Sequence, residues 1–128
     1  MIGKLVNYLL SNSAGLTALV SNKIFPYVIN EDTLLPVVIY TIDSLDAIYD
    51  KNRWVSDEFK VSVKNYGSDY TQVENVAYQI RLALENKQGR INNITCNRIE
   101  LTGQEEGYEM TEGVYYNKLI FNIIVTSY

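Results

Sequence analysis

The sequence predicts an α+β fold: a mostly antiparallel β-sheet of about five strands with helices packed on one face. Apolar residues recur at helical spacing near the start of the chain and again over residues 71–88. Before and after this second stretch lie segments rich in β-branched residues, which favour strands. Strands joined by short connections usually pair antiparallel, and helices then tend to cover one face of the sheet. The expected order is α-α-β-β-β-α-β-β.

Two short helices are expected first. Residues 2–11 place apolar side chains at helical spacing, and 14–20 repeat the pattern after a break. The break is Ser11-Asn12-Ser13, whose side chains compete for backbone hydrogen bonds and favour helix caps. The side chains expected to face inward are Ile2, Leu5, Val6, Leu9, Leu16, Leu19 and Val20.

Three strands are expected before the long helix. Residues 24–27 form a short extended piece, in which Pro26 excludes a central strand. A β-branched run over 37–42 predicts the second strand. Residues 43–54 are polar and mixed, which indicates a long loop or a hairpin tip. Around 59–63 apolar and polar residues alternate, as in a strand with one wet face.

The long helix carries signals at both ends. Capping-box spacing begins at Asp69 and again at Thr71, so the helix should start near Thr71. Gly89 is the expected C-terminal stop, which places the helix end near Gln88. The predicted inner stripe consists of Val73, Val76, Ala77, Ile80, Ala83 and Leu84.

Two further strands are expected over 94–101 and 114–126. Between them, residues 103–113 are rich in glycine and glutamate, which predicts a mobile acidic loop. The last strand is apolar on both faces, so both should be covered. Helices would cover one face, and a neighbouring subunit or a second layer of the same chain the other. The glutamates of the predicted loop are Glu105, Glu106, Glu109 and Glu112.

Composition narrows the function. The 128 residues fit one domain spanning 1–128. A net charge of −4 with scattered cations argues against sequence-independent nucleic-acid binding. A single cysteine excludes an internal disulfide. No apolar run approaches the ~20 residues of a membrane span.

The residues for common catalytic chemistry are missing. Histidine is absent, which removes Ser-His-Asp and Cys-His catalysis and the commonest metal ligand. Cys96 is expected to be a small buried or half-buried strand residue, and a reactive thiol is the alternative. Asp43, Asp46 and Asp50 lack the spacing and closing glutamate of a calcium loop. The chain is therefore expected to be no enzyme and to hold no cofactor or metal.

One helix position points to a partner. Tyr78 and Leu82 are i and i+4, on the side of the long helix opposite its apolar stripe. A helix on the surface of a monomer usually keeps that side polar. Isolated exposed apolar residues are common, and a contact with a second subunit is the alternative.

Several segments together resemble a known family. They combine an opening helix, a proline followed by an apolar strand ending in tyrosine, an alternating strand, a helix and a long last strand. The segments are Leu16–Val20, Ile24–Pro26, Pro36–Tyr40, Phe59–Val63, Ala77–Leu84 and Tyr116–Val125. In order and spacing the chain resembles the tail-completion (tail-terminator) family of siphophage-type bacteriophages, often described only as a domain of unknown function.

The resemblance implies a structural protein of a phage or prophage, located in the virion tail and assembled in the cytoplasm of the bacterial host. Such a protein would form a hexameric ring that caps the tail tube, ends tube polymerisation and provides a head-joining surface. Its partners would be further copies of itself, the tail tube protein and a head–tail connector protein. DNA could pass through the ring without specific binding, and no membrane would be involved.

Other functions stay open. A head-closure or connector protein would look similar in sequence. A small carboxylate-dependent enzyme or a ligand-binding domain would instead show a deep pocket with two carboxylates. Within the tail-completion interpretation, Tyr78 and Leu82 are expected to meet a neighbouring subunit. The acidic loop is expected to face the channel or the connector.

Overall fold

A computed structural model describes residues 2–30 and 32–128, which form three helices and six strands. The prediction of an α+β fold is confirmed, with one more strand than the approximate five, because residues 89–91 form a short strand of their own. The elements are α1 (Ile2–Ser11), α2 (Ala14–Val20), β1 (Ile24–Pro26), β2 (Val37–Asp50), β3 (Arg53–Gly67), α3 (Tyr70–Leu84), β4 (Gly89–Ile91), β5 (Ile94–Glu109) and β6 (Val114–Ser127).

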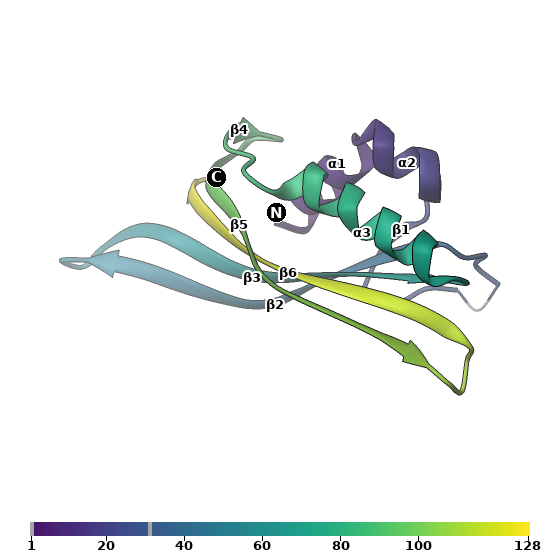
Figure 1. Cartoon of the computed structure of the whole chain (residues 1–128). Coiled ribbons are helices and arrows are strands. Elements are labelled where there is room, and N and C mark those ends of the chain that lie inside the picture. The colour runs from purple at the N-terminus through teal and green to yellow at the C-terminus, as the bar shows by residue number, and fades with distance from the viewer. Residues whose placement is uncertain (1, 31) are drawn as a thin grey trace.

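All six strands join one sheet in the order β1-β2-β3-β6-β5-β4. The β1–β2 pair is parallel and the other pairs are antiparallel. Pro26 lies in the edge strand β1, where a missing backbone N–H costs no ladder bond. The described helices lie together on one face of the twisted sheet, and the opposite face is open (Figure 1).

The core fills the space between the helices and the covered face of the sheet. Phe121 of β6 is fully buried at its centre, and the predicted inner stripe of α3 is buried as expected. Leu19 is an exception, since it is 40% exposed. Its short helix turns Leu16 and Val20 into the core instead, because these two lie one turn apart on the same side.

Side-chain caps start the helices as the sequence predicts. Ser13 precedes α2, and its hydroxyl accepts a hydrogen bond from the backbone N–H of Leu16 (3.4 Å). Asp69 precedes α3, and its carboxylate accepts from the N–H of Gln72 (2.8 Å). Each cap satisfies a backbone donor that has no partner within the first turn.

The end of α3 differs from the prediction. The helix stops at Leu84, before the expected end near Gln88. Asn86 adopts a left-handed conformation (φ 64°), and its N–H donates to the carbonyl of Ile99 on β5 (3.0 Å). The backbone hydrogen bond to β5 therefore ends the helix before Gly89, the predicted stop.

The segment 43–54 is a hairpin rather than a loop. β2 continues to Asp50 and β3 begins at Arg53, so only Lys51 and Asn52 make the turn. Both turn residues have positive φ (49° and 66°), as a type I′ hairpin requires. The outer parts of β2 and β3 were not predicted as strands, because their many polar residues hide the alternation of apolar and polar side chains.

The predicted acidic loop at 103–113 is also wrong over most of its length. β5 continues to Glu109, and only residues 110–113 form the turn, in which Gly113 has a φ of 67°. Glu105 and Glu106 pair with Lys118 and Asn117 of β6. The long last strand supplies a hydrogen-bonding ladder that extends its partner, despite the glycines and charges in that segment.

Candidate assembly surfaces

The outward side of α3 exposes the two side chains that the sequence selected. Tyr78 is 60% exposed and Leu82 is 51% exposed. Between them on the helix, the guanidinium of Arg81 forms an ion pair with the carboxylate of Glu85. The predicted exposure of this side is confirmed, and its role as an interface stays a prediction.

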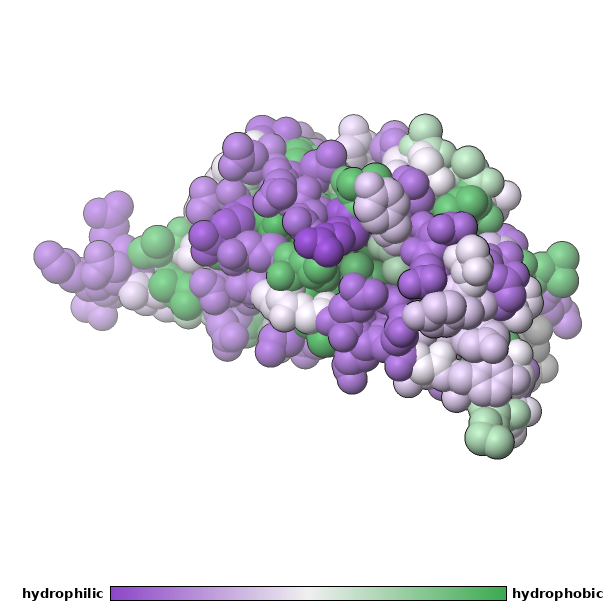
Figure 2. All heavy atoms as spheres, in the orientation of Figure 1, coloured by the Kyte–Doolittle hydropathy of each residue, from purple (hydrophilic) through white to green (hydrophobic). Residues whose placement is uncertain are grey.

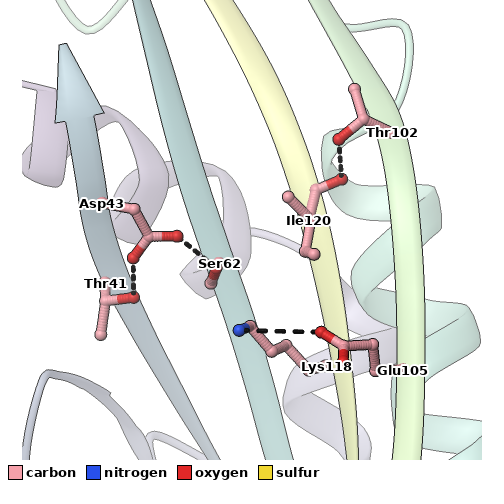
Figure 3. A network of polar contacts seen from close by, with 7 residues as sticks. All are labelled: Thr41, Asp43, Ser62, Thr102, Glu105, Lys118 and Ile120. Carbon is pink, nitrogen blue, oxygen red and sulfur yellow. Dashed lines mark hydrogen bonds and ion pairs between the residues drawn. The ribbon is translucent and has the colours of Figure 1, made fainter.

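The open face of the sheet is polar where the central strands cross it (Figure 3). Asp43 accepts hydrogen bonds from Thr41 Oγ1 (2.8 Å) and from the hydroxyl of Ser62 on β3. On β6 and β5, Lys118 Nζ lies 3.8 Å from a carboxylate oxygen of Glu105. Polar side chains on neighbouring strands thus form hydrogen bonds and an ion pair with one another. Such a face suits contact with water or with a polar partner.

Two of the outer strands carry bulges on this face. The β2–β3 register shifts between Ile42 and Ser44, leaving Asp43 as the extra residue. The β5–β6 register shifts between Leu101 and Gly103, leaving Thr102, whose hydroxyl donates to the carbonyl of Ile120 (3.1 Å; Figure 3). A bulge bends its strand, so these positions mark where each hairpin begins to turn away from the flat part of the sheet.

The four predicted acidic residues do not form one cluster. Glu105 and Glu109 alternate onto the open face, Glu106 lies on the helix side, and Glu112 is in the turn. Glu106 accepts a hydrogen bond from the Tyr70 hydroxyl (2.8 Å). This bond and the nearby negative charge raise the pKa of Tyr70 to about 12. The hypothesis that these glutamates act together therefore loses its premise.

The β2–β3 hairpin projects from the body as an arm (Figures 1 and 2). Its outermost atoms are hydrophilic, and apolar atoms lie directly behind them (Figure 2). We call residues 43–56 the hairpin arm. Its exposed apolar side chains are Leu45, Ile48, Tyr49, Trp54 and Val55. The sequence alone did not single out this arm as a candidate site.

A buried carboxylate anchors the arm to the sheet. Asp57 is 9% exposed and accepts hydrogen bonds from Trp54 Nε1 (2.9 Å) and from the Tyr128 hydroxyl (2.5 Å). The rings of Trp54 and Tyr128 also pack with centroids 6.2 Å apart. Burial, followed by the bond to Asp57, raises the pKa of Tyr128. The arm is thus fixed at its base and projects beyond it.

A groove of about 350 Å³ lies at the opposite end of the sheet. Its walls come from residues 27–29 and Leu35, from the start of β2, and from the end of β5 with the β5–β6 turn. Glu109 and Glu112 give it two carboxylates, and Tyr66 lies in its lining. We call this the acidic groove. Lys64 Nζ lies 5.0 Å from the centroid of the Tyr66 ring, directed at its face. The remaining lining residues are Tyr27, Val28, Ile29, Leu35, Ile39 and Val114.

A larger cavity of about 590 Å³ lies between α1 and the start of the sheet. Its lining carries the amine of Lys4 and the amide of Asn7, and no carboxylate among the described residues. Tyr27 bridges its rim, because its hydroxyl lies 3.2 Å from both the N–H and the carbonyl of Ile42. This arrangement offers no pair of carboxylates for hydrolytic chemistry.

Two buried amides lie where the hairpins meet. Asn65 of β3 and Asn117 of β6 are direct cross-strand partners, 0% and 1% exposed. Within the described residues, neither side-chain polar atom of Asn65 has a hydrogen-bond partner, and Asn117 Nδ2 reaches Glu106 at 3.4 Å. Sequence reasoning missed this pair, since asparagine in an alternating strand usually signals an exposed position.

The other candidates for chemistry were metal-ligating groups and the single thiol. Among residues 2–30 and 32–128, no group of three or more metal-ligating side chains is present. Cys96 is buried as predicted, and burial raises the pKa of its thiol. No helix in the described part of the chain has both the length and the apolar character needed to cross a membrane.

Comparison with known proteins identifies the fold. No protein-family model matches the chain, and no curated protein does. A solved structure does match it, with a TM-score of 0.84 over 97% of this chain and 93% of the other, at 13% sequence identity. That structure is described as "Virion of native gene transfer agent (GTA) particle". At this identity the likeness shows a shared fold across nearly the whole of both chains.

Proposed function

We propose that this chain is a structural component of a phage-like virion, and more narrowly a tail-completion protein that caps the tail tube as a ring. The observation that carries the proposal is the shared fold, at a TM-score of 0.84 over 97% of the chain, with a chain of a gene transfer agent virion. The likeness of the sequence to tail-completion proteins supports the narrower role independently.

The surfaces suit assembly better than catalysis. A structural subunit needs faces that neighbours can cover, and α3 presents Tyr78 and Leu82 outward. The open polar face, with Lys118 beside Glu105, suits the wall of a channel through which DNA passes without specific contacts. The groove carboxylates Glu109 and Glu112 line a surface groove rather than a closed pocket. We therefore propose a role without enzymatic activity or cofactor.

The proposed mechanism is geometric. A terminator must copy one end of the tube interface and withhold the other, so that no further tube subunit can add. A ring of identical subunits in head-to-tail contact achieves this when the rotation between neighbours closes. The hexameric state, the tube protein and the head–tail connector as partners, and the location in the virion tail come from the family resemblance and belong to the proposal.

Deletion of the gene in its phage or prophage tests this role. Negative-stain imaging of the lysate should show filled heads lying apart from tails of abnormal or excessive length. Tails of normal length lying apart from heads would favour the alternative, a head-closure or connector protein. Normal, joined and infectious particles would rule out both, and would return attention to a ligand-binding or carboxylate-dependent function.

A double substitution tests the α3 surface separately. Tyr78→Ser with Leu82→Ser should weaken ring assembly, because it removes the exposed apolar contact without disturbing the buried stripe. Asn75→Ser, at an exposed polar position of the same helix, is the matched control. Unchanged ring formation by electron microscopy, with an unchanged unfolding midpoint, would show that this side of α3 is not an interface.

A further inference from the structure

We propose that the hairpin arm of one copy docks into the acidic groove of a second copy. This inference rests on the proposed ring-forming role and names the contact that would build the ring. The proposed function gives neither the arm nor the groove a binding partner.

The tip of the arm and the groove carry opposite charges. The tip, residues 50–53, holds the cations Lys51 and Arg53 beside one carboxylate, Asp50, whereas the other carboxylates of the arm, Asp43 and Asp46, lie farther back toward its base. The groove contributes Glu109 and Glu112. Opposite charges on two surfaces favour their encounter and fix the orientation of the contact.

Both surfaces also expose apolar side chains. Behind the tip, Tyr49 is 65% exposed, and Ile48 and Val55 are also exposed. Beside the acidic residues of the groove, Val28 and Met110 are among the most exposed apolar side chains of the chain. A charged tip with an apolar shaft would thus meet a groove with a charged rim and apolar walls, the usual composition of a protein interface.

The arm and the groove lie at opposite ends of the molecule. Arg53 at the tip and Tyr66 in the groove lie at opposite ends of the same strand, β3. At about 3.3 Å per residue, thirteen residues of strand separate them by roughly 40 Å. Figure 1 shows the arm and the β5–β6 turn pointing away from each other. The arm cannot reach the groove of its own chain, so a contact between them is head-to-tail between copies.

Such a contact has a defined consequence. Each copy has one arm and one groove on opposite ends, so the contact is heterologous and repeats from copy to copy. The contact yields a closed ring if the rotation between neighbouring copies divides a full turn evenly, and a helical filament if it does not. A twisted sheet with bulges at Asp43 and Thr102 departs from a straight rod, which favours closure.

Zero-length carbodiimide coupling of the purified chain at high concentration tests the contact directly. This reagent joins an amine to a carboxylate only when the two touch. A Lys51–Glu109 or Lys51–Glu112 amide, identified by mass spectrometry in covalent dimers and larger species, is the expected result. Because these residues lie roughly 40 Å apart within one chain, such a link must be intermolecular. Coupled species that lack both links, or no coupled species at all, would overturn the proposal.

Charge reversal provides a second, self-controlled test. Two variants reverse the charge of one partner each: Lys51→Glu/Arg53→Glu in the arm and Glu109→Lys/Glu112→Lys in the groove. Each variant alone should no longer form the ladder of covalent dimers and larger species. An equal mixture of the two variants should regain it, because each reversed arm then meets a reversed groove. Lys4→Glu/Lys60→Glu makes the same change in net charge as the arm variant, at exposed positions away from the arm tip, and should keep the ladder. A mixture that stays monomeric while both variants remain folded would overturn the contact.

The two proposals can fail separately. If deletion of the gene gives overlong tails while coupling finds neither link, the chain is a terminator whose ring is built by other contacts. If coupling finds the links while tails keep a normal length, the arm–groove contact stands and the tail-completion role does not.

Discussion

The two long hairpins are built alike and anchored differently. The outer strand of β2–β3 carries a bulge at Asp43, and that of β5–β6 carries one at Thr102. The first ends in a two-residue turn and has exposed apolar side chains. The second ends in a four-residue turn, with Tyr108 packed against Tyr115 at 4.7 Å between ring centroids. Similar backbone design thus produces one projecting arm and one hairpin braced by its own aromatic rings.

Each hairpin is tied to the body by a tyrosine hydroxyl that donates to a carboxylate. In the arm the acceptor is Asp57, which is nearly buried and holds two donors. In the β5–β6 hairpin the acceptor is Glu106, which is exposed and bound by Tyr70. Because hydrogen bonds to a charged group gain strength as water is excluded, the arm should depend on its carboxylate more than the other hairpin does.

The largest effect is expected where the two hairpins share their core. Phe121 of β6 pairs with Val61 of β3 on one side and Leu101 of β5 on the other. Phe121→Ala should lower the free energy of unfolding by about 3–5 kcal/mol, because it leaves a cavity under both hairpins. Urea unfolding monitored by circular dichroism measures the loss. Val28→Ala, at a 77% exposed position, is the control and should change stability by less than about 0.5 kcal/mol.

The next largest effect is expected at Asp57, where the arm is anchored to the sheet. Asp57→Ala should cost about 1.5–3 kcal/mol, because it removes the acceptor of two hydrogen bonds at a buried site. Trp54 is the only tryptophan of the chain, so its emission should shift to longer wavelength as the base of the arm opens. Asp46→Ala, exposed on the same arm, is the control. Equal unfolding midpoints and equal emission for the two variants would mean that the carboxylate does not anchor the arm.

The same anchor should respond to alkali. Burial and Asp57 raise the pKa of Tyr128 above the usual 10.0, so the neutral phenol is favoured in the folded state. This contribution to stability is complete below pH 10 and declines as the pH rises further. Tyr128→Phe should therefore be less stable than the natural chain at pH 8, and the difference should narrow above pH 10. A difference that stays constant across this range would contradict the linkage.

The sequence predicted the core well because burial imposes periodicity. The stripe of α3 and the caps Ser13 and Asp69 were all found from spacing and residue type. The same spacing placed Tyr78 on the outer side of this helix. These features depend on local geometry, which a single sequence records directly.

The sequence left a hairpin tip at 43–54 open beside a loop and missed the β5–β6 hairpin, because partner strands rather than local pattern set the geometry of both. Residues 43–50 and 103–109 are polar, charged or glycine-rich, and they become strands because neighbouring strands extend beside them. The arm, the acidic groove and the Asn65–Asn117 pair all depend on this pairing. Long-range register decides which side chains meet, and no local pattern encodes it.

A smaller effect, and a stabilising one, is expected from a substitution where the two hairpins meet. Within the described residues, the buried amide of Asn65 has no hydrogen-bond partner, so it carries a desolvation cost. Asn65→Leu should raise the free energy of unfolding by about 1 kcal/mol. Asn122→Leu, on the open face of β6, is the control and should stay within about 0.5 kcal/mol. A loss of stability in Asn65→Leu would show that the amide has a partner, such as a bound water, that supports both hairpins.

The smallest effect is expected at the anchor of the β5–β6 hairpin. Tyr70→Phe removes the hydroxyl that donates to Glu106, and both side chains are exposed, so the urea midpoint should hardly move. The informative readout is the absorbance of ionised tyrosine. Tyr70→Phe should remove a component that titrates near pH 12, whereas Tyr78→Phe on the same helix should retain it. Because the pKa of Tyr128 is also raised, the amplitudes are compared: if Tyr70→Phe loses no more of this alkaline component than Tyr78→Phe does, the bond to Glu106 is not formed in solution. The β5–β6 hairpin would then be held by its aromatic packing and by contacts between its own strands, such as that of Lys118 with Glu105, which would sharpen its contrast with an arm held by a buried carboxylate.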